Sequence, residues 1–316
     1  MATLWLVRPL RKGGPLPLFS IIIVTYNQEH FIRDAVDSAL AQPCPSKEVI
    51  VVDDGSSDGT VQVLEQYGDK IRLLKMGTNQ GANRARNAGA AMATGDYLVS
   101  LDGDDLFLPW ALQTYQRIIE LKKPKVILCR LLFFRGPLPA QPFSDFGGKI
   151  QVVEYDALVR KDHPLGLSVS AIVVERPVFE QVGGFTNEIW PSEIDDLTMK
   201  MGYSGRTIHI LSHPTVGYRI HANNTIHQVS RFLDTMHMVL RKEKMGLYPG
   251  GPRLRRERYV YLGSAVIYWF RRAMIAGHYR RAARFLAAGW LMMLAALISK
   301  LGHRISGRHP VETIPL

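Results

Sequence analysis

The 316-residue sequence predicts an α/β protein, in which a mostly parallel sheet has helices on both faces and a C-terminal helical extension follows. Between residues 18 and 105, strand-like and helix-like patterns alternate at the short spacing typical of parallel sheets. From 228 to 305 the pattern is helical and increasingly basic. A hydrophobic content of 47% and a charged content of 21% exclude wholesale disorder.

The first strand is expected at 18–24, an almost continuous apolar run of the kind that is buried on both faces. A helix at about 29–41 follows and is closed by Pro43. The next elements are a strand at 48–52, a helix from 58–60, a strand at 70–75, a helix at 82–93 and a strand at 97–101. Further strands are expected near 125–134 and 169–175, and the last residues, 309–316, as a loose tail.

These patterns divide the chain into an N-terminal segment at 1–17, a main domain at 18–227 and the extension at 228–316. Within the main domain, the regular strand–helix half at 18–105 is distinguished from the less regular half at 106–227.

The formal net charge is +11, and much of the excess follows residue 240. Such a tail suits an anionic partner or is a solvated helix face. Nucleic acid is disfavoured, because the arginines of 253–258 lack interleaved aromatic residues.

Cys44 and Cys129 lack metal-ligand spacing, which favours a reducing, cytoplasmic location. Since the longest uncharged apolar run, 285–299, falls short of a spanning helix, we expect a soluble protein or a peripheral one on the inner face of a membrane.

Polar clusters follow the strands of the first half, and the carboxyl ends of parallel strands meet at one edge of a sheet. The clusters are Thr25-Tyr26-Asn27, the segment 53–59, Asn79-Gln80-Gly81 and the segment 102–105. Ligand binding is therefore expected at this edge.

The sharpest cluster is Asp102-Gly103-Asp104-Asp105. Its three carboxylates repel each other unless a cation or protons offset their charge, and Mg²⁺ or Mn²⁺ suits carboxylates together with phosphate oxygens. The alternative is a turn rich in aspartate that caps the next segment. The position directly after a buried strand favours the metal.

Asp54 is not explained by local structure, whereas Ser57 or Asp58 would cap the following helix. An unpaired Asp54 at the strand end could accept hydrogen bonds from a nucleobase or ribose. Asn83, Arg86 and Asn87 share one helical face by their spacing. Either Arg84 or Arg86 could meet a phosphate or base, and the alternative is an arginine that faces solvent.

In this order the motifs resemble the family 2 glycosyltransferases, over residues 20–225. The matching segments are 24–27, 52–60, 79–81, 85–89, 101–105, 183–185 and 218–225. The resemblance implies the GT-A fold, a Rossmann-like nucleotide-sugar-binding fold, with 18–105 as the nucleotide-binding half and 106–227 as the acceptor-binding half. It implies a donor site formed by Thr25, Tyr26, Asn27, Asp54, Asn79, Gly81, Asn83, Arg86, Asp102 and His221. The implied metal ligands are Asp102, Asp104 and His221, with Asp105 as a third carboxylate candidate.

The catalytic base is where this sequence departs from the family pattern. Family members often read Glu-Asp-X-Asp-Leu, with the second residue as the base, but here Ile194 occupies that position. Asp195 or Glu193 must then act, and Asp195 is favoured; Asp196 could instead cap the helix that extends to 201.

The resemblance implies an inverting, metal-assisted transfer of a sugar from a nucleoside-diphosphate-sugar, with UDP favoured, to a hydroxyl of a glycan, glycolipid or other glycoconjugate. Such a reaction serves polysaccharide biosynthesis. The altered base leaves one alternative, a catalytically inactive member that binds nucleotides or glycans. The extension is expected to be a helical hairpin packed on the domain or pairing subunits as a homodimer, or else an interfacial helix that dips Trp290, Leu291 and Met292 into a bilayer.

Overall fold

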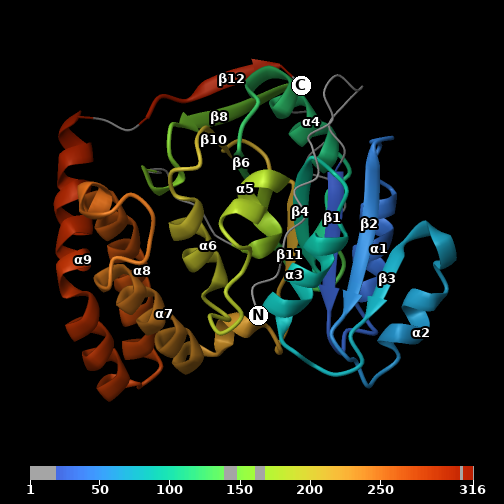
Figure 1. The fold of residues 1–316 in the computed structure, drawn as a ribbon, viewed down its shortest axis with the longest axis horizontal. Coiled ribbons are helices and arrows are strands. Elements are labelled where there is room, and N and C mark those ends of the chain that lie inside the picture. Colours follow the sequence, from blue (N-terminus) through green and yellow to red (C-terminus); the bar gives the residue numbers. More distant parts are fainter. Residues whose placement is uncertain (1–18, 139–147, 161–167, 307–308, 316) are drawn as a thin grey trace.

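The computed structural model describes residues 19–138, 148–160, 168–306 and 309–315, so the expected N-terminal segment at 1–17 lies outside the described residues. Over these ranges the main sheet has nine strands in the order β12-β8-β10-β6-β9-β4-β1-β2-β3 (Figure 1). Its strands are β1 Phe19–Thr25, β2 Lys47–Asp53, β3 Arg72–Lys75, β4 Tyr97–Asp102, β6 Val126–Leu128, β8 Lys149–Tyr155, β9 Ile172–Glu175, β10 Thr207–Ile210 and β12 Glu312–Pro315.

The strand directions agree with the predicted sheet. β1 pairs in parallel with both β2 and β4, and β2 pairs in parallel with β3. β9 runs antiparallel between β4 and β6, and β8 runs antiparallel between β10 and β12. Among the described strands, therefore, only β8 and β9 oppose the rest, and the mostly parallel α/β fold is confirmed.

Helices cover both faces of this sheet because successive residues of its apolar strands point to opposite sides. Ile21 and Ile23 pack with α1 Ile32–Leu40 and α4 Ala111–Lys122. Ile22 packs on the other face, and the helices there are α3 Ala82–Met92, α5 Arg176–Gln181 and α6 Glu193–Met201. The short helix α2 Thr60–Glu65 packs beside α1.

A second, three-stranded sheet in the order β5-β11-β7 continues from the end of β4. Its strands are β5 Leu106–Phe107, β7 Leu131–Phe134 and β11 Val216–Arg219. Short 3-10 turns lie at Gly68–Lys70, Leu158–Arg160, Val169–Ala171, Thr225–His227 and Pro252–Leu254.

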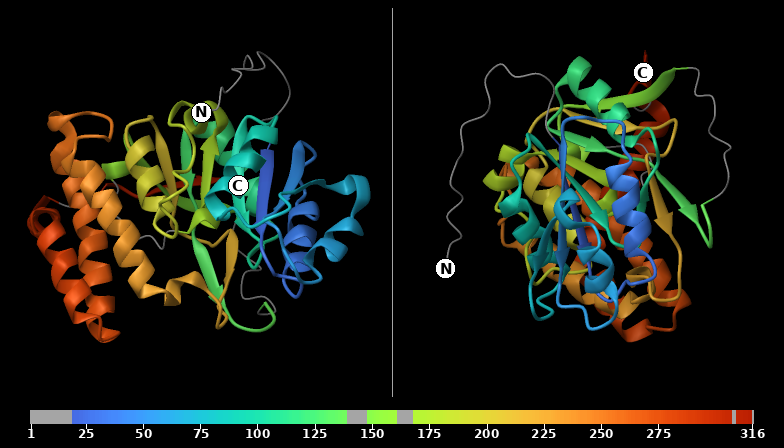
Figure 2. Two further views of the ribbon diagram at one scale, coloured as in Figure 1. Left: turned by 60° about the horizontal axis from the view of Figure 1, so that its bottom comes forward. Right: turned by 90° about the vertical axis from the view of Figure 1, so that its right-hand side faces the viewer.

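The C-terminal extension forms three long helices, α7 Val229–Lys244, α8 Arg255–Ile275 and α9 Tyr279–Ser306, at the end of the molecule opposite α2 and β3 (Figure 2). The helical hairpin expected from the sequence is α8 and α9. Both pack against α7, and this helical cluster also contains Ala157 and Ile189 from the main domain. The extension thus shares a hydrophobic core with the second half of that domain.

The expectation of a loose tail at 309–316 is wrong for its described part. β12 pairs antiparallel with β8, and its Ile314 is buried opposite Ile150. Glu312 also forms an ion pair with Lys122 at 2.7 Å. The tail becomes ordered because it satisfies the hydrogen-bonding groups of an otherwise open sheet edge.

The expectation that no segment is long enough to cross a membrane also needs correction. The segment Tyr279–Leu301 of α9 is long and apolar enough to do so, by length and composition alone. The uncharged apolar run at 285–299 is bounded by Arg284 and Lys300. A helix that crosses a membrane can nevertheless contain one or two charged residues, so the apolar segment is longer than that run.

Gly263 allows α8 and α9 to approach each other closely, because a Cβ atom there would clash with the backbone carbonyl of Met292. We expect Gly263→Ala to lower the free energy of unfolding by about 1–3 kcal/mol, as overpacking of a dense interface does. Urea denaturation measures this. Ser264→Ala, at the exposed next position, is the control and should leave stability nearly unchanged; equal effects would contradict the close contact.

Candidate active site

The parallel strands bring the predicted polar clusters to one edge of the sheet. Thr25 at the end of β1 pairs with Asp53 of β2, and Val24 pairs with Asp102 of β4. After β3 the chain crosses back to place β4 on the other side of β1, so this edge contains a topological switch point, where α/β sheets bind ligands.

A cleft of about 860 Å³ opens at this edge. Twelve of the predicted residues line it: Thr25, Tyr26, Asn27, Asp54, Asn79, Gly81, Arg86, Asp102, Asp104, Glu193, Asp195 and His221. Asn83 and Asp105 do not line it.

The loop after β1 is fixed by a residue in the left-handed backbone conformation. Asn27 has φ of 53°, its backbone N–H donates to Ser56 Oγ at 2.9 Å, and its Oδ1 accepts from the backbone N–H of Ser57 at 2.8 Å. Asparagine tolerates this conformation better than most residues. The adjacent Tyr26 is left 45% exposed on the cleft wall, where its ring is available to a planar ligand.

Asp54 is not the unpaired carboxylate that the sequence suggested. Its two oxygens accept the backbone N–H groups of Gln80 at 2.7 Å and Gly81 at 2.9 Å, and the side chain is buried. Asp54 therefore holds the loop that begins α3. A carboxylate has further lone pairs, so Asp54 can still accept a ligand hydrogen bond from the cleft.

The expectation that Ser57 or Asp58 caps α2 is wrong, because Gly59 is the N-cap residue and the helix has no side-chain cap hydrogen bond. Asp58 Oδ1 instead accepts from the backbone N–H of Thr60 at 3.0 Å, which holds the turn before the helix.

At the end of β4, Asp102 and Asp104 reach the cleft on either side of Gly103. Asp104 Oδ2 lies 2.9 Å from His221 Nε2, and the His221 ring stacks on Phe31 with the ring centroids 4.9 Å apart. Gly103 lies close to the loop after β1, since a Cβ there would lie 2.3 Å from Gln28 Oε1 and 3.0 Å from Thr25 Cβ.

Asp105 was a candidate metal ligand, and the structure contradicts this. It is buried, with one oxygen accepting from Ser170 Oγ at 2.7 Å and the other from the backbone N–H of Arg219 at 3.1 Å. Burial, with the charges of Asp104 and Asp102, raises the pKa of Asp105 well above its ordinary value. Arg219 Nε also donates to the carbonyl of Asp104 at 3.1 Å, so a residue that the sequence did not assign fixes this loop.

The metal-ligand candidates that remain after Asp105 is excluded suit an ion whose coordination is shared between protein and substrate. No group of three or more His, Cys, Asp or Glu side chains arranged to hold a metal occurs among the described residues. Asp102 and Asp104 nevertheless present carboxylates on the cleft wall, beside His221. Mg²⁺ and Mn²⁺ suit one or two protein carboxylates completed by phosphate oxygens, so these two aspartates fit that role.

Arg86 on α3 connects the two walls of the cleft. Its guanidinium donates to Asp102 Oδ1 at 2.7 Å and to Glu193 Oε1 at 3.1 Å, and the side chain is buried. Burial raises the pKa of Glu193 to about 7, and the Arg86 charge opposes this shift. The other carboxylate oxygen of Glu193 is buried without a hydrogen-bond partner.

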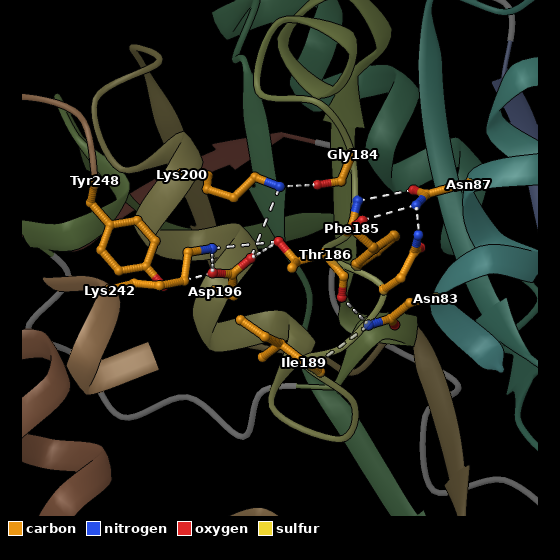
Figure 3. Close-up of polar contacts among 11 residues, drawn as sticks. Asn83, Asn87, Gly184, Phe185, Thr186, Ile189, Asp196, Lys200, Lys242 and Tyr248 are labelled. Atoms are coloured by element: carbon orange, nitrogen blue, oxygen red, sulfur yellow. Dashed lines mark hydrogen bonds and ion pairs between the residues drawn. The ribbon is translucent and has the colours of Figure 1, made fainter. Parts of the chain in front are cut away.

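On the shared helical face, Asn83 and Asn87 bond other parts of the protein, whereas Arg86 also lines the cleft. Asn83 Nδ2 donates to the carbonyl of Thr186 at 2.8 Å, and Asn87 exchanges hydrogen bonds with both backbone groups of Phe185 (Figure 3). Asn83 is buried and was wrongly placed in the donor site; it anchors the loop before α6.

Asp196 has a structural role, but not the predicted helix cap. α6 begins at Glu193, and the buried Asp196 bonds Lys242, Tyr248 Oη at 2.6 Å and Thr186 Oγ1 at 2.6 Å (Figure 3). Asp196 thus joins α6 to α7. Because its carboxylate is buried and bonded to these partners, Asp196 is excluded as the catalytic base.

The two remaining candidates both line the cleft. Glu193 is almost completely buried, whereas Asp195 is half-buried and accepts from Tyr261 Oη of α8 at 3.1 Å. Asp195 is therefore the more accessible carboxylate.

Sequence reasoning missed the aromatic wall of the cleft. It consists of Trp190, Phe232, Tyr261, Tyr268 and Trp269, three of them on α8. The spacing of the α8 residues, at i, i+7 and i+8, places them on one helical face, which was a usable signal. It could not reveal that this face meets the cleft.

The model of glycosyl transferase family 2 matches residues 20–183, which is 164 of the 316 residues. The chain belongs to this family. An uncharacterised glycosyltransferase of Rickettsia prowazekii is 29% identical over 239 residues, covering 72% of each chain. The poly(ribitol-phosphate) β-N-acetylglucosaminyltransferase TarS of Staphylococcus aureus is 26% identical over 200 residues, covering 61% of this chain but only 34% of TarS.

Solved structures share the fold. TarS 1–349 in complex with UDP superposes with a TM-score of 0.61 at 22% identity, covering 78% of this chain and 70% of that one. The mannosyltransferase PcManGT of Pyrobaculum calidifontis, in complex with GDP-Man and Mn²⁺, gives a TM-score of 0.53 at 16% identity, covering 95% and 90%. These likenesses confirm the GT-A fold.

We expect Arg86→Met to lower the free energy of unfolding by about 3–5 kcal/mol, because it leaves two carboxylates without their cation. The pKa of Glu193 in the folded state lies above its ordinary value of 4.5, so its contribution to stability is present at low pH and lost as the pH rises through about 7. The loss in Arg86→Met should therefore be larger at pH 8 than at pH 6.

Urea denaturation at both pH values measures this effect. Arg84→Met is the matched control, since Arg84 is exposed on the same helix and should change stability by less than about 0.5 kcal/mol. Arg86→Lys keeps the charge but loses the planar guanidinium that bonds two carboxylates. Its loss in free energy of unfolding should therefore lie between those of Arg84→Met and Arg86→Met. Equal losses for both methionine variants would contradict the bridging role.

Proposed function

We propose that this glycosyltransferase transfers a sugar from a nucleoside-diphosphate-sugar, with a UDP-sugar favoured, to a hydroxyl group of a glycan, glycolipid or other glycoconjugate. One observation carries the proposal. The side chains that suit a nucleotide and a diphosphate line the same cleft as Asp195, a half-buried carboxylate. The TarS structure with UDP supports the choice of nucleotide.

On the donor side, Tyr26 would contact the base, and Asp54 the base or ribose. Asp102, Asp104 and His221 would face the diphosphate. Asp102 and Asp104 would hold a divalent ion, which offsets the charge that develops on the departing diphosphate. The Mn²⁺ in the PcManGT structure supports a metal of this kind.

On the acceptor side, we propose Asp195 as the base. A base must reach the hydroxyl proton that it removes, and Asp195 is the less buried of the two carboxylates. Deprotonation lets the acceptor oxygen attack the anomeric carbon as the bond to the diphosphate breaks, so a single displacement inverts that centre. Glu193, paired with Arg86, would position the helix that presents Asp195.

The donor site is tested by hydrolysis of UDP-, GDP- and dTDP-sugars with Mn²⁺, Mg²⁺ or EDTA. We expect slow release of UDP from a UDP-sugar, abolished by EDTA and by Asp104→Asn, because the carboxylate no longer helps to hold the ion. Asp69→Asn, in the turn before β3 and far from the cleft lining, is the control and should retain activity. If calorimetry with Mn²⁺ finds no nucleotide binding at all, the transferase proposal fails.

The base is tested by kinetics once an acceptor has been found. Asp195→Asn should lower kcat by roughly 10²–10⁴-fold without weakening nucleotide binding, as loss of a general base does. Glu193→Gln should retain most of the activity. If instead Glu193→Gln lost activity and Asp195→Asn kept it, Glu193 would be the base. The pH dependence of kcat should then show an ionisation near pH 7 that disappears in Glu193→Gln, because the pKa of Glu193 is raised to about 7. Nucleotide binding without turnover under any condition would favour the inactive, binding-only alternative.

A further inference from the structure

One side of α9 is an exposed apolar stripe that no described part of the chain covers. Its residues recur at helical spacing and are each 44–59% exposed: Trp290, Leu291, Leu294, Leu297, Ile298 and Leu301. We call these six residues the α9 outer face. At 1.5 Å per residue it extends for about 17 Å along the edge of the molecule (Figure 1).

The opposite side of the same helix is packed. Phe285, Met292 and Ala296 are buried in the cluster with α7 and α8, or against Gly263. The α9 outer face therefore faces away from the body and is not the core side of the helix. Met292, which the sequence analysis placed in a bilayer with Trp290 and Leu291, belongs to this buried side.

Cations precede and follow the α9 outer face along the helix, and α9 contains no carboxylate; Arg281 is paired with Asp234 of α7 at 3.3 Å. The sequence of α9 contains Arg280, Arg281, Arg284, Lys300 and Arg304 and no Asp or Glu. The turn before it exposes Ile275 and Tyr279, 86% and 63% respectively, among the same arginines. A long apolar stripe flanked by arginines, with an aromatic residue on it, is typical of helices that lie in a bilayer interface.

A second copy of the chain fits this surface poorly. Pairing two α9 helices would bring the exposed Arg280 and Arg284 of each copy close together, with no acidic residue on either helix. Like charges across an interface cost free energy, whereas an anionic surface attracts all of them.

The connections of α9 indicate that it lies on the membrane rather than crossing it. Its N-terminal end follows His278, whose Nε2 lies 3.2 Å from Ser230 Oγ of α7. Its C-terminal end leads to β12, which is paired into the main sheet. Both ends are thus held by one folded body.

We propose that the α9 outer face binds the surface of a bilayer containing anionic lipids, with its apolar side chains among the acyl chains and its arginines at the headgroups. Trp269 of α8 lines the cleft, and Ile275 is on the next turns of that helix. The attachment would therefore set the mouth of the cleft beside the membrane. This proposal concerns attachment and does not depend on the chemistry proposed above.

The test is co-sedimentation of the full chain with vesicles of phosphatidylglycerol and phosphatidylcholine, or of phosphatidylcholine alone. Binding to the anionic vesicles is expected, weakening as salt is added. The double variant Leu294→Glu with Ile298→Glu should bind at least about tenfold more weakly, since it buries charge in place of apolar surface. Leu121→Glu, a substitution of an equally exposed leucine on α4, is the control and should bind like the unchanged chain.

Two further measurements separate the contributions. Arg280→Glu and Arg284→Glu should each weaken binding by roughly fivefold or more, in line with one headgroup interaction per arginine. Brominated lipids should quench the fluorescence of the chain, and Trp290→Phe should remove that quenching while leaving binding largely intact.

Three results would overturn the proposal. The chain could fail to sediment with anionic vesicles, or bind equally after Leu294→Glu with Ile298→Glu. It could instead form a dimer, in sedimentation equilibrium without lipid, that this double variant dissociates; the α9 outer face would then be a subunit interface.

Discussion

The buried guanidinium of Arg86 is the interaction on which the cleft depends. It lies between Asp102, at the end of β4, and Glu193, at the start of α6. Glu193 is 107 residues from Arg86 along the chain. Two carboxylates at the floor of a cleft repel each other and lose hydration, so they require a cation between them. Because one planar group bonds both, the wall that would hold the donor is fixed relative to the wall that carries the acidic cluster.

The strand ends that form one side of this site could be predicted from the sequence. The strand positions follow from nearly continuous apolar runs, and the parallel-sheet rule then placed Thr25, Asp54 and Asp102 at one edge. These are local patterns combined with a general constraint on topology. The same reasoning found that Asn83 and Arg86 share a helical face, but it could not find what that face packs against. Asn83 contacts a loop about a hundred residues away, and such contacts leave no mark in spacing.

The elements that sequence reasoning missed all depend on distant partners. Asp105 is one of three neighbouring aspartates, and only the fold shows that it points inward, to Ser170 and Arg219. β12 is four residues long with a single buried side chain, Ile314, and resembles a tail until the edge of β8 is there to pair with it. The aromatic side chains of α8 form a visible stripe, yet the cleft that they complete is built by the first half of the chain.

The acidic cluster at the start of α6 links the two proposals physically. Three carboxylates in the first turn are favoured by the helix dipole, and the structure gives each a different environment. Glu193 is paired with Arg86, and Asp196 is paired with Lys242. Asp195 alone of the three is half-buried at the cleft, and Tyr261 of α8 donates to it. Since α8 and α9 pack as one hairpin, the helix that completes the surroundings of the proposed base is also the helix that supports the α9 outer face. The hydrogen bond from Tyr261 to Asp195 is thus the direct contact between this hairpin and the proposed base.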